Sequence, residues 1–317
     1  MFNLTKTQLS EKANELGFIR DTLEKALRLV DILSYLNQNK ITQDTMALKG
    51  GTALNLIVFD LPRLSLDIDL DFHKNLSREE MLPIRGSITG DLVTYMTTQG
   101  YALKPGGRSS HSLDPLIFSY RSTGGMNDNI KIEINYSLRS HLLPPIRKSI
   151  TPKFYERVDG ILCLDTIEIF AAKINALISR AAPRDLYDVY NLIRSGVISE
   201  SELPILRKAT IFYTAISQPK IPSYYELNPI DRISQRDIRT ELLPVIQKAE
   251  RIDLDVMKTS AKSFLVNLFH LTENERLFLD SFARKSYHPE YLFDDTVIVD
   301  RVRNHPVALW KCRRTDD

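Results

Sequence analysis

The sequence predicts an α+β protein that carries its strands in the first half and is mainly helical in the second. Two observations support this prediction. Short runs between residues 46 and 138 alternate apolar and polar side chains, which is the period of half-buried strands. From residue 165 onward, apolar residues recur at three- and four-residue spacing, as they do on amphipathic helices. Because 317 residues are many for a single hydrophobic core, we expect two domains, 1–160 and 161–317.

The composition is that of an ordinary soluble globular protein, with 43% apolar and 26% charged residues. The formal net charge of +2 does not indicate a nucleic-acid binder and does not exclude one, because a local basic patch is enough. The two cysteines lie far apart, which is typical of the reducing cytoplasm, where we expect this protein to act. Neither a signal peptide nor an apolar run of membrane-spanning length is present, so no membrane association is expected.

The first half begins with helices and leads to a short strand followed by two glycines. Helical spacing of apolar residues covers 7–39, with Gly17 as a break. A strand is expected at 46–48 and a helix at 52–59. Ser77 is the expected N-cap of a helix that runs to about residue 99, which Pro83 and Gly86 interrupt early.

Alternate aspartates mark the strand that follows the glycines. Asp67, Asp69 and Asp71 share one face of an extended segment, in steps of about 7 Å, since each residue adds roughly 3.3 Å. Crowded carboxylates repel one another unless a cation holds them, and hard oxygen ligands suit Mg²⁺ or Mn²⁺. Glycines ahead of them let the backbone approach a phosphate closely. The alternative is a polar strand face that is simply solvated.

A second polar strand face occurs at 130–136. Its isoleucines share one face, while Lys131, Glu133 and Asn135 share the other. Glu133 is therefore a candidate for a third carboxylate beside the aspartates, as a two-metal phosphoryl-transfer site would use. A solvated Lys–Glu–Asn stripe is the alternative.

The second half carries one further charged pattern. Lys173 lies within a predicted helix at 166–179, and Asp185 and Asp188 lie three residues apart on the next one, where they can orient a lysine or arginine. An ion-paired helix surface is the alternative. Further helices are expected at 241–250, 256–269 and 273–282, and Trp310 is expected to anchor the core. The histidines show no ligand spacing and no Gly-x-Ser-x-Gly element occurs, so metallohydrolase and serine-hydrolase functions have no support.

These patterns together resemble those of a known toxin family. The glycine segment reads Lys49-Gly50-Gly51-Thr52-Ala53-Leu54, and the strand is preceded by Arg63-x-Ser65-x-Asp67-x-Asp69. Both resemble the AbiEii/AbiGii toxins, which include the MenT toxins, within the polymerase-β-like nucleotidyltransferases. The downstream motif of these toxins is similar to Lys173-x-x-Ala176-Leu177-x-x-Arg180 and Arg184-Asp185-x-x-Asp188. Two departures from the broader superfamily are Thr52 in place of serine and a long interval between Gly51 and Asp67.

The resemblance implies a bilobed protein, with a mixed-sheet nucleotidyltransferase core followed by a helical lobe that completes an active-site cleft. It implies a toxin that transfers a nucleotide from an NTP, with Mg²⁺ or Mn²⁺, to the 3′ end of tRNA, and that is countered by a winged-helix antitoxin. Catalytic roles fall on Asp67, Asp69, Lys173, Asp188 and Glu133, with Asp67 and Asp69 as metal ligands. Nucleotide binding falls on Lys49, Gly50, Gly51, Thr52, Ser65, Arg180 and Asp185.

The acceptor of the nucleotide is the least constrained expectation. Three basic segments, 104–111, 139–153 and 301–314, could follow RNA phosphates, although a plain turn or a solvated tail would have the same composition. A protein or small-molecule acceptor is one alternative, and a non-catalytic nucleotide-binding protein is another. The complete set of Asp67, Asp69 and Lys173 argues against the latter, since a degenerate site has no chemical need for it.

Overall fold

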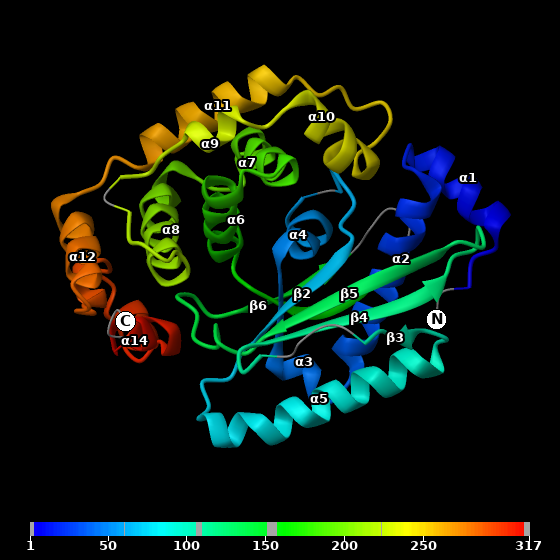
Figure 1. The fold of residues 1–317 in the computed structure, drawn as a ribbon, viewed down its shortest axis with the longest axis horizontal. Coiled ribbons are helices and arrows are strands. Elements are labelled where there is room, and N and C mark those ends of the chain that lie inside the picture. The colour runs from blue at the N-terminus through cyan, green and yellow to red at the C-terminus, as the bar shows by residue number, and fades with distance from the viewer. Residues whose placement is uncertain (1–2, 60, 106–109, 151–156, 223, 314–317) are drawn as a thin grey trace. The chain divides into compact units, whose positions relative to one another are not determined.

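The computed structural model describes residues 3–59, 61–105, 110–150, 157–222 and 224–313. It confirms the predicted α+β class: helices accompany a seven-stranded mixed sheet (Figure 1). Residues 106–109, 151–153 and 314 of the predicted basic segments lie outside the described residues. None of the helices in the described ranges is long and apolar enough to cross a membrane.

The chain divides into two compact units that exchange short segments. The first unit comprises Met1–Arg139, Pro145–Leu164 and Leu243–Glu250, and the second comprises Ser140–Pro144, Asp165–Leu242 and Arg251–Asp317. A single division between residues 160 and 161 was the expectation from sequence. The long-range contacts instead place the main division at residues 164/165 and interleave the two halves of the chain.

The first unit begins with helices α1 (Lys6–Leu16) and α2 (Arg20–Gln38), as predicted. Gly17 separates them at φ +73°, a left-handed conformation that glycine adopts without steric cost. Helix α3 (Thr42–Thr45) precedes the sheet. Helix α5 (Arg78–Thr98) begins at a capping box formed by Ser77 and Glu80 and packs beside an edge strand, β3 (Figure 1).

The sheet has the strand order β3-β4-β5-β2-β1-β7-β6. Its strands are β1 (Met46–Lys49), β2 (Asp67–Phe72), β3 (Ala102–Leu103), β4 (Leu113–Arg121), β5 (Asn127–Asn135), β6 (Ile146–Ile150) and β7 (Val158–Cys163). The aspartate strand β2 lies in the middle, antiparallel to β1 and parallel to β5. The isoleucines of β5 and the apolar residues of β2 are fully buried, which is the burial that their alternation predicted.

The segment 243–250 returns to the first unit and fixes two of its turns. The Leu64 amide, directly before the aspartate strand, donates to the Val245 carbonyl at 2.7 Å. The Lys248 amide donates to the Gly17 carbonyl, also at 2.7 Å. The late segment therefore anchors both the break between α1 and α2 and the start of the aspartate strand.

The second unit is helical. Its α-helices are α6 (Thr166–Arg180), α7 (Pro183–Ser195), α8 (Leu203–Ser217), α9 (Asn228–Asp231), α10 (Gln235–Asp237), α11 (Leu254–Leu268), α12 (Glu273–Ala283), α13 (Thr296–Val302) and α14 (Pro306–Arg313). Short turns of 3₁₀ or π type are η2 (Glu200–Glu202), η3 (Ile238–Leu242) and η5 (Pro289–Tyr291), while η4 (Leu243–Val245) belongs to the first unit.

Buried polar groups tie residues 140–144 to this helical unit. A Glu168 carboxylate oxygen accepts from the Leu143 amide at 2.6 Å, and the Tyr213 hydroxyl donates to the other oxygen at 2.7 Å. Arg301 donates to the carbonyls of His141 and Leu143. Arg301 belongs to a predicted phosphate-binding segment, but these bonds give it a structural role.

Three expectations from the sequence are wrong. Pro83 and Gly86 do not interrupt α5, which runs through both residues; Pro83 is its sixth residue, and the one intrahelical hydrogen bond that it removes does not end the helix. The predicted helix at 241–250 is replaced by the short turns η3 and η4 and an irregular segment. Trp310 is not a core anchor: it is 54% exposed on α14.

Candidate functional site

The register of the sheet gathers the predicted carboxylates on one face. Asp69 pairs with Glu133 of β5 on one side and with Lys49 of β1 on the other. Asp67 pairs with Lys131 of β5. Since directly paired residues on neighbouring strands project to the same face, these aspartates and Glu133 line a common surface of the first unit. Both aspartates are half-buried, so the face is partly shielded from water and still accessible.

The two glycines form the turn that faces this strand. Gly50 begins α4 (Gly50–Ala53), which continues into the π-helix η1 (Leu54–Val58). Its φ is +70°, and a Cβ placed there would lie 2.3 Å from Asp69 Oδ2. The backbone therefore approaches the carboxylate more closely than any other residue type would permit.

Hydroxyl groups fasten the glycine turn to the start of the aspartate strand. The Thr52 side chain is fully buried and lies 2.8 Å from the Ser65 hydroxyl. It also donates to the main-chain carbonyl of Asp67. Threonine in place of the superfamily's serine is thereby explained, because its methyl group is buried while its hydroxyl holds the strand.

The third aspartate of the stripe has a different environment. Asp71 is 1% exposed, and its Oδ1 lies 2.5 Å from the Lys49 ammonium. This buried ion pair engages Lys49, which the sequence placed among the nucleotide-binding residues. Asp71 is therefore engaged by Lys49, whereas Asp67 and Asp69 are the half-buried carboxylates of the stripe.

The predicted residues of the second unit form a cluster of their own. Lys173 of α6 lies 2.9 Å from Asp188 Oδ2 and 3.2 Å from Asp185 Oδ1, both on α7. Arg180, at the end of α6, lies 2.6 Å from the other Asp185 oxygen. A tight turn between the helices makes this possible, with Ala181 in the left-handed region and Pro183 starting α7.

This cluster is buried, unlike an ordinary ion-paired helix surface. Lys173 is 9% exposed, Asp185 1% and Asp188 0%. An ammonium group has three N–H donors, and the two carboxylates account for two of them. One N–H donor of the Lys173 ammonium is not used by these two carboxylates.

Comparison with known proteins identifies the family. The model of the AbiEii nucleotidyl transferase toxins of type IV toxin–antitoxin systems matches residues 31–267, about three quarters of the chain. This chain belongs to the AbiEii family. Its fold is similar to that of the MenT4 nucleotidyltransferase toxin of Mycobacterium tuberculosis, with a TM-score of 0.65 and 16% sequence identity over 97% of this chain and 99% of that one. No match was found among curated protein sequences.

Lys131 is a residue of this AbiEii site that the sequence did not single out. Its ammonium lies 2.6 Å from Glu133 Oε2. Burial lowers the pKa of Lys131, but the hydrogen bond and charge of Glu133 outweigh that effect, so the pKa lies above its ordinary value. The charges of Asp67 and Asp69 act in the same direction. Lys131 thus balances the negative charge of Asp67, Asp69 and Glu133, which together form the carboxylate face. The only signal for Lys131 in the sequence was its position two residues before Glu133.

The carboxylate face suits a divalent ion completed by substrate. Within the described parts of this AbiEii chain, no group of three or more His, Cys, Asp and Glu side chains could hold a metal ion on its own. Mg²⁺ commonly binds through one or two carboxylates together with substrate phosphates. Asp67 and Asp69, which share one face of β2, would provide that pair.

Gly50→Ala is expected to reduce activity and stability together. The left-handed backbone costs an L-residue about 1–2 kcal/mol, and the new methyl group would displace Asp69. A displacement of about 1 Å at a reacting centre can cost ~10²-fold in rate. Thermal unfolding and nucleotide transfer measure the two effects. Gly90→Ala in α5 is the matched control, since nothing lies within 4 Å of its added carbon. An alanine at residue 50 with wild-type activity would contradict the close approach.

Proposed function

We propose that this protein is a metal-dependent nucleotidyltransferase toxin that transfers a nucleoside monophosphate from an NTP to RNA, with the 3′ end of tRNA as acceptor, and so blocks translation in the cytoplasm. Family membership implies transferase activity, a nucleotide substrate and a cognate antitoxin. The observation that carries the proposal is the close approach of Gly50 to Asp69 on a strand face shared with Asp67 and Glu133. A winged-helix antitoxin remains part of the proposal.

The proposed reaction forms one bond and breaks one. The oxygen of the acceptor 3′-hydroxyl attacks the α-phosphorus of the NTP, and the bond between that phosphorus and the bridging oxygen to the β-phosphate breaks. Pyrophosphate leaves, and the hydroxyl proton passes to a carboxylate of Asp69 or Glu133. A divalent ion held by Asp67 and Asp69 would supply charge neutralisation at the phosphates.

The remaining residues would hold the nucleotide. The Gly50 and Gly51 amides would bind a phosphate through the backbone, since neither residue adds a side chain of its own to a turn that Asp69, Arg63 and Ser65 already crowd. Thr52 and Ser65 keep that turn on the aspartate strand. We assign Lys173 to the triphosphate on the strength of the family motif and its remaining N–H donor, with Asp185, Asp188 and Arg180 as its positioning partners.

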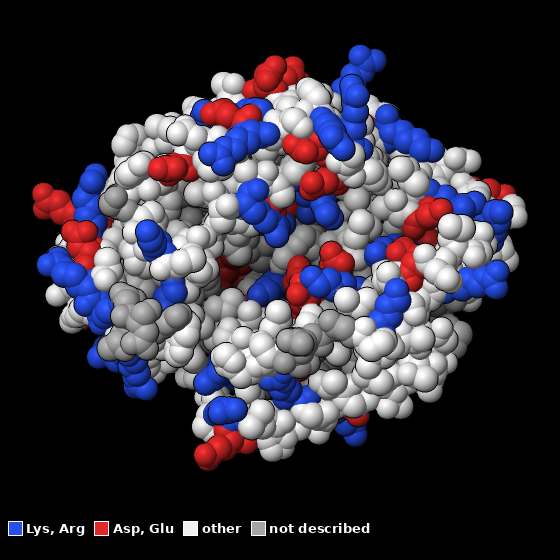
Figure 2. Space-filling model, viewed as in Figure 1, with Lys and Arg blue, Asp and Glu red and all other residues white. Residues whose placement is uncertain are grey.

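The distribution of basic side chains bears on an RNA acceptor. Figure 2 shows basic and acidic side chains interspersed over the visible face. Several cations of the predicted basic segments are engaged within the fold. Arg147 pairs with Asp44, and Lys311 donates to the carbonyls of Ala215 and Gln218. RNA recognition by these segments alone is therefore weaker than the composition suggested.

A labelling experiment tests the proposed function. The pure protein is incubated with total RNA and each radiolabelled NTP in turn, with and without Mg²⁺. We expect label in small RNA, only with the metal, and from a restricted set of NTPs. If label enters protein or a small molecule and no RNA is extended with any NTP, the proposal that RNA is the acceptor is wrong, while the proposal of nucleotide transfer is kept. If no acceptor is labelled, the proposal that this protein is a nucleotidyltransferase under these conditions is wrong.

A further inference from the structure

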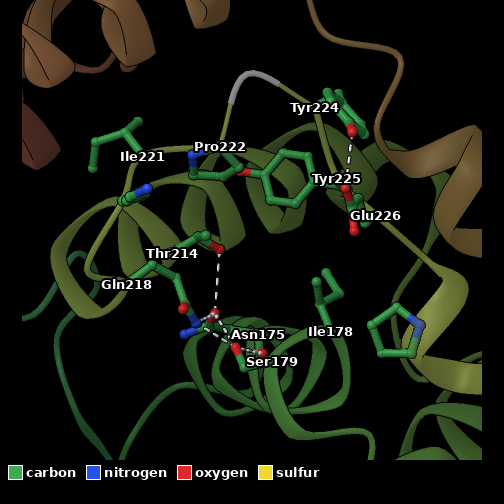
Figure 3. Close-up of a pocket in the computed structure, with 12 residues that line it drawn as sticks. Asn175, Ile178, Ser179, Thr214, Gln218, Ile221, Pro222, Tyr224, Tyr225 and Glu226 are labelled. Atoms are coloured by element: carbon green, nitrogen blue, oxygen red, sulfur yellow. Dashed lines mark hydrogen bonds between the residues drawn. The ribbon is translucent and has the colours of Figure 1, made fainter. Parts of the chain in front are cut away.

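A hollow of about 410 Å³ lies within the second unit, away from the Lys173 ammonium. Its floor is formed by α6 and the end of α8, and its roof by residues 220–222 and 224–226 (Figure 3). Figure 3 shows Ile178 rising from the floor into the hollow, with Tyr224 and Tyr225 above it. Its volume lies in the usual range of small-molecule sites.

The floor presents a pre-arranged set of polar groups. Asn175 Oδ1 accepts from the Ser179 hydroxyl at 3.3 Å, the Thr214 hydroxyl at 3.4 Å and the Gln218 amide at 3.3 Å. Asn175 Nδ2 donates to the Ser217 hydroxyl at 2.8 Å. This network fixes the orientation of both amide side chains. Gln218 Nε2 also donates to the Ser179 hydroxyl, so the acceptor that Gln218 can offer to an occupant is its Oε1.

The roof presents flat apolar and aromatic surfaces. Tyr225 stacks on Phe269 with ring centroids 3.8 Å apart and 8° between the planes. Burial raises the pKa of Tyr225, against a smaller opposing effect of the Thr214 hydroxyl, so its phenol is a hydrogen-bond donor at neutral pH. Tyr224 is 66% exposed and donates to Glu226 at 2.8 Å. A flat ring with donors and acceptors along its edge would match both the floor and the roof.

Two other hollows of the same unit share lining residues with it, and we call the three neighbouring hollows together the groove. One shares Ser179 with it, has a volume of about 420 Å³ and is lined by Arg180 and Arg232, with two acidic residues beyond them. The other shares Tyr224 and Tyr225, has a volume of about 220 Å³ and is lined by Arg276. Guanidinium groups on both sides of an aromatic hollow suit a chain of alternating bases and phosphates.

We propose that this groove binds a single-stranded segment of RNA and that its central hollow holds one unpaired nucleobase. The inference rests on the proposed function, because it names the part of the acceptor that the second unit would grip. Helices and loops line the groove, and no described strand edge borders it, so an extended peptide would find no β-pairing partner there. Base stacking would use its aromatic rings, base readout its amide groups and phosphate binding its guanidinium groups.

Binding of fluorescein-labelled ribohexamers tests the proposal without NTP or Mg²⁺. The probes are oligo(A), oligo(C), oligo(U) and one mixed hexamer that contains G. Ile178→Trp fills the hollow, and Tyr224→Ala removes an exposed ring. Each is expected to raise the Kd for the bound hexamer about tenfold or more, since base–aromatic stacking has that magnitude. Tyr224→Phe keeps the ring and should bind as the wild type does.

Controls separate folding, ligand source and the proposed function. Val297→Trp makes a comparable change at a 65% exposed position on α13 and should leave binding unchanged. Unchanged affinity in folded Ile178→Trp, or no hexamer binding by the wild type, overturns the proposal. Nucleoside monophosphates that bind where hexamers do not would also overturn it, by showing a free-nucleotide site. Asp69→Asn should bind hexamers normally, so failure of transfer and failure of the groove are distinguishable.

Discussion

Replacing Asp69 by asparagine is expected to abolish nucleotide transfer and toxicity while the protein remains folded. An amide oxygen lacks the negative charge that a divalent ion requires of its ligands. Asp69 is flanked by Glu133 and approached by Gly50, so no other carboxylate can take its position without moving the strand. Metal-assisted catalysis contributes several kcal/mol, and each ~1.4 kcal/mol is tenfold in rate, so we expect a loss of ~10³-fold or more. Asp67→Asn should behave similarly.

The measurement is incorporation of labelled nucleotide, together with thermal unfolding to show that the variant is folded. Asp159→Asn is the matched control, since it makes the same chemical change on the exposed surface of β7 in the same unit. Its transfer rate should equal that of the wild type. Full activity in folded Asp69→Asn would rule out the carboxylate face as the metal site.

Lys173→Ala is expected to have the second large effect, on both rate and stability. A positioned donor to developing phosphate charge is often worth ~10²–10³ in rate. The structure adds a second consequence, because removing the ammonium leaves Asp188 buried beside Asp185 without its cation. Breaking a buried ion pair in this way costs about 3–5 kcal/mol of stability. Lys173→Arg keeps the charge and should recover part of the rate, since a guanidinium does not fit a point-charge site.

A double variant separates catalysis from stability. Lys173→Met combined with Asp188→Asn removes both members of the ion pair, and it should recover much of the melting temperature lost in Lys173→Met alone. The transfer rate should stay low. Recovery of the rate together with the melting temperature would show that Lys173 only supports the fold.

The local sequence pattern predicted which strands and helices carry the site residues and which strand face they lie on, but not which strands pair with each other. The alternation of residues 67–71 and 130–136 predicted that Asp69 and Glu133 each lie on a polar strand face, and both do. The two strands are parallel neighbours, with Asp69 and Glu133 in register. This pairing depends on contacts between residues more than 60 positions apart, and the alternation of side chains within one strand cannot predict it. For the same reason, the sequence pattern did not distinguish Lys131 from the other residues of a solvated polar strand face.

The errors have related causes. Residues 241–250 have helical composition, but the chain there must return to the first unit and pair with the segment before the aspartate strand, so tertiary contacts override propensity. Trp310 was assigned to the core by residue type alone, whereas burial depends on which face of α14 packs. Lys173, Asp185 and Asp188 were placed correctly on consecutive helices, yet their burial came from the packing of α6 and α7 and not from spacing.

The interleaved chain has a consequence for how this gene can be divided. Val245 and Lys248, encoded far downstream, close the turns at Leu64 and Gly17. Residues 140–144, encoded between strands of the sheet, complete the helical unit instead. Dividing the chain at one position therefore leaves neither unit complete. A fragment that ends near residue 160 would lack residues 243–250, which hold the start of its aspartate strand. Each unit is therefore expected to fold completely only when the whole chain is present.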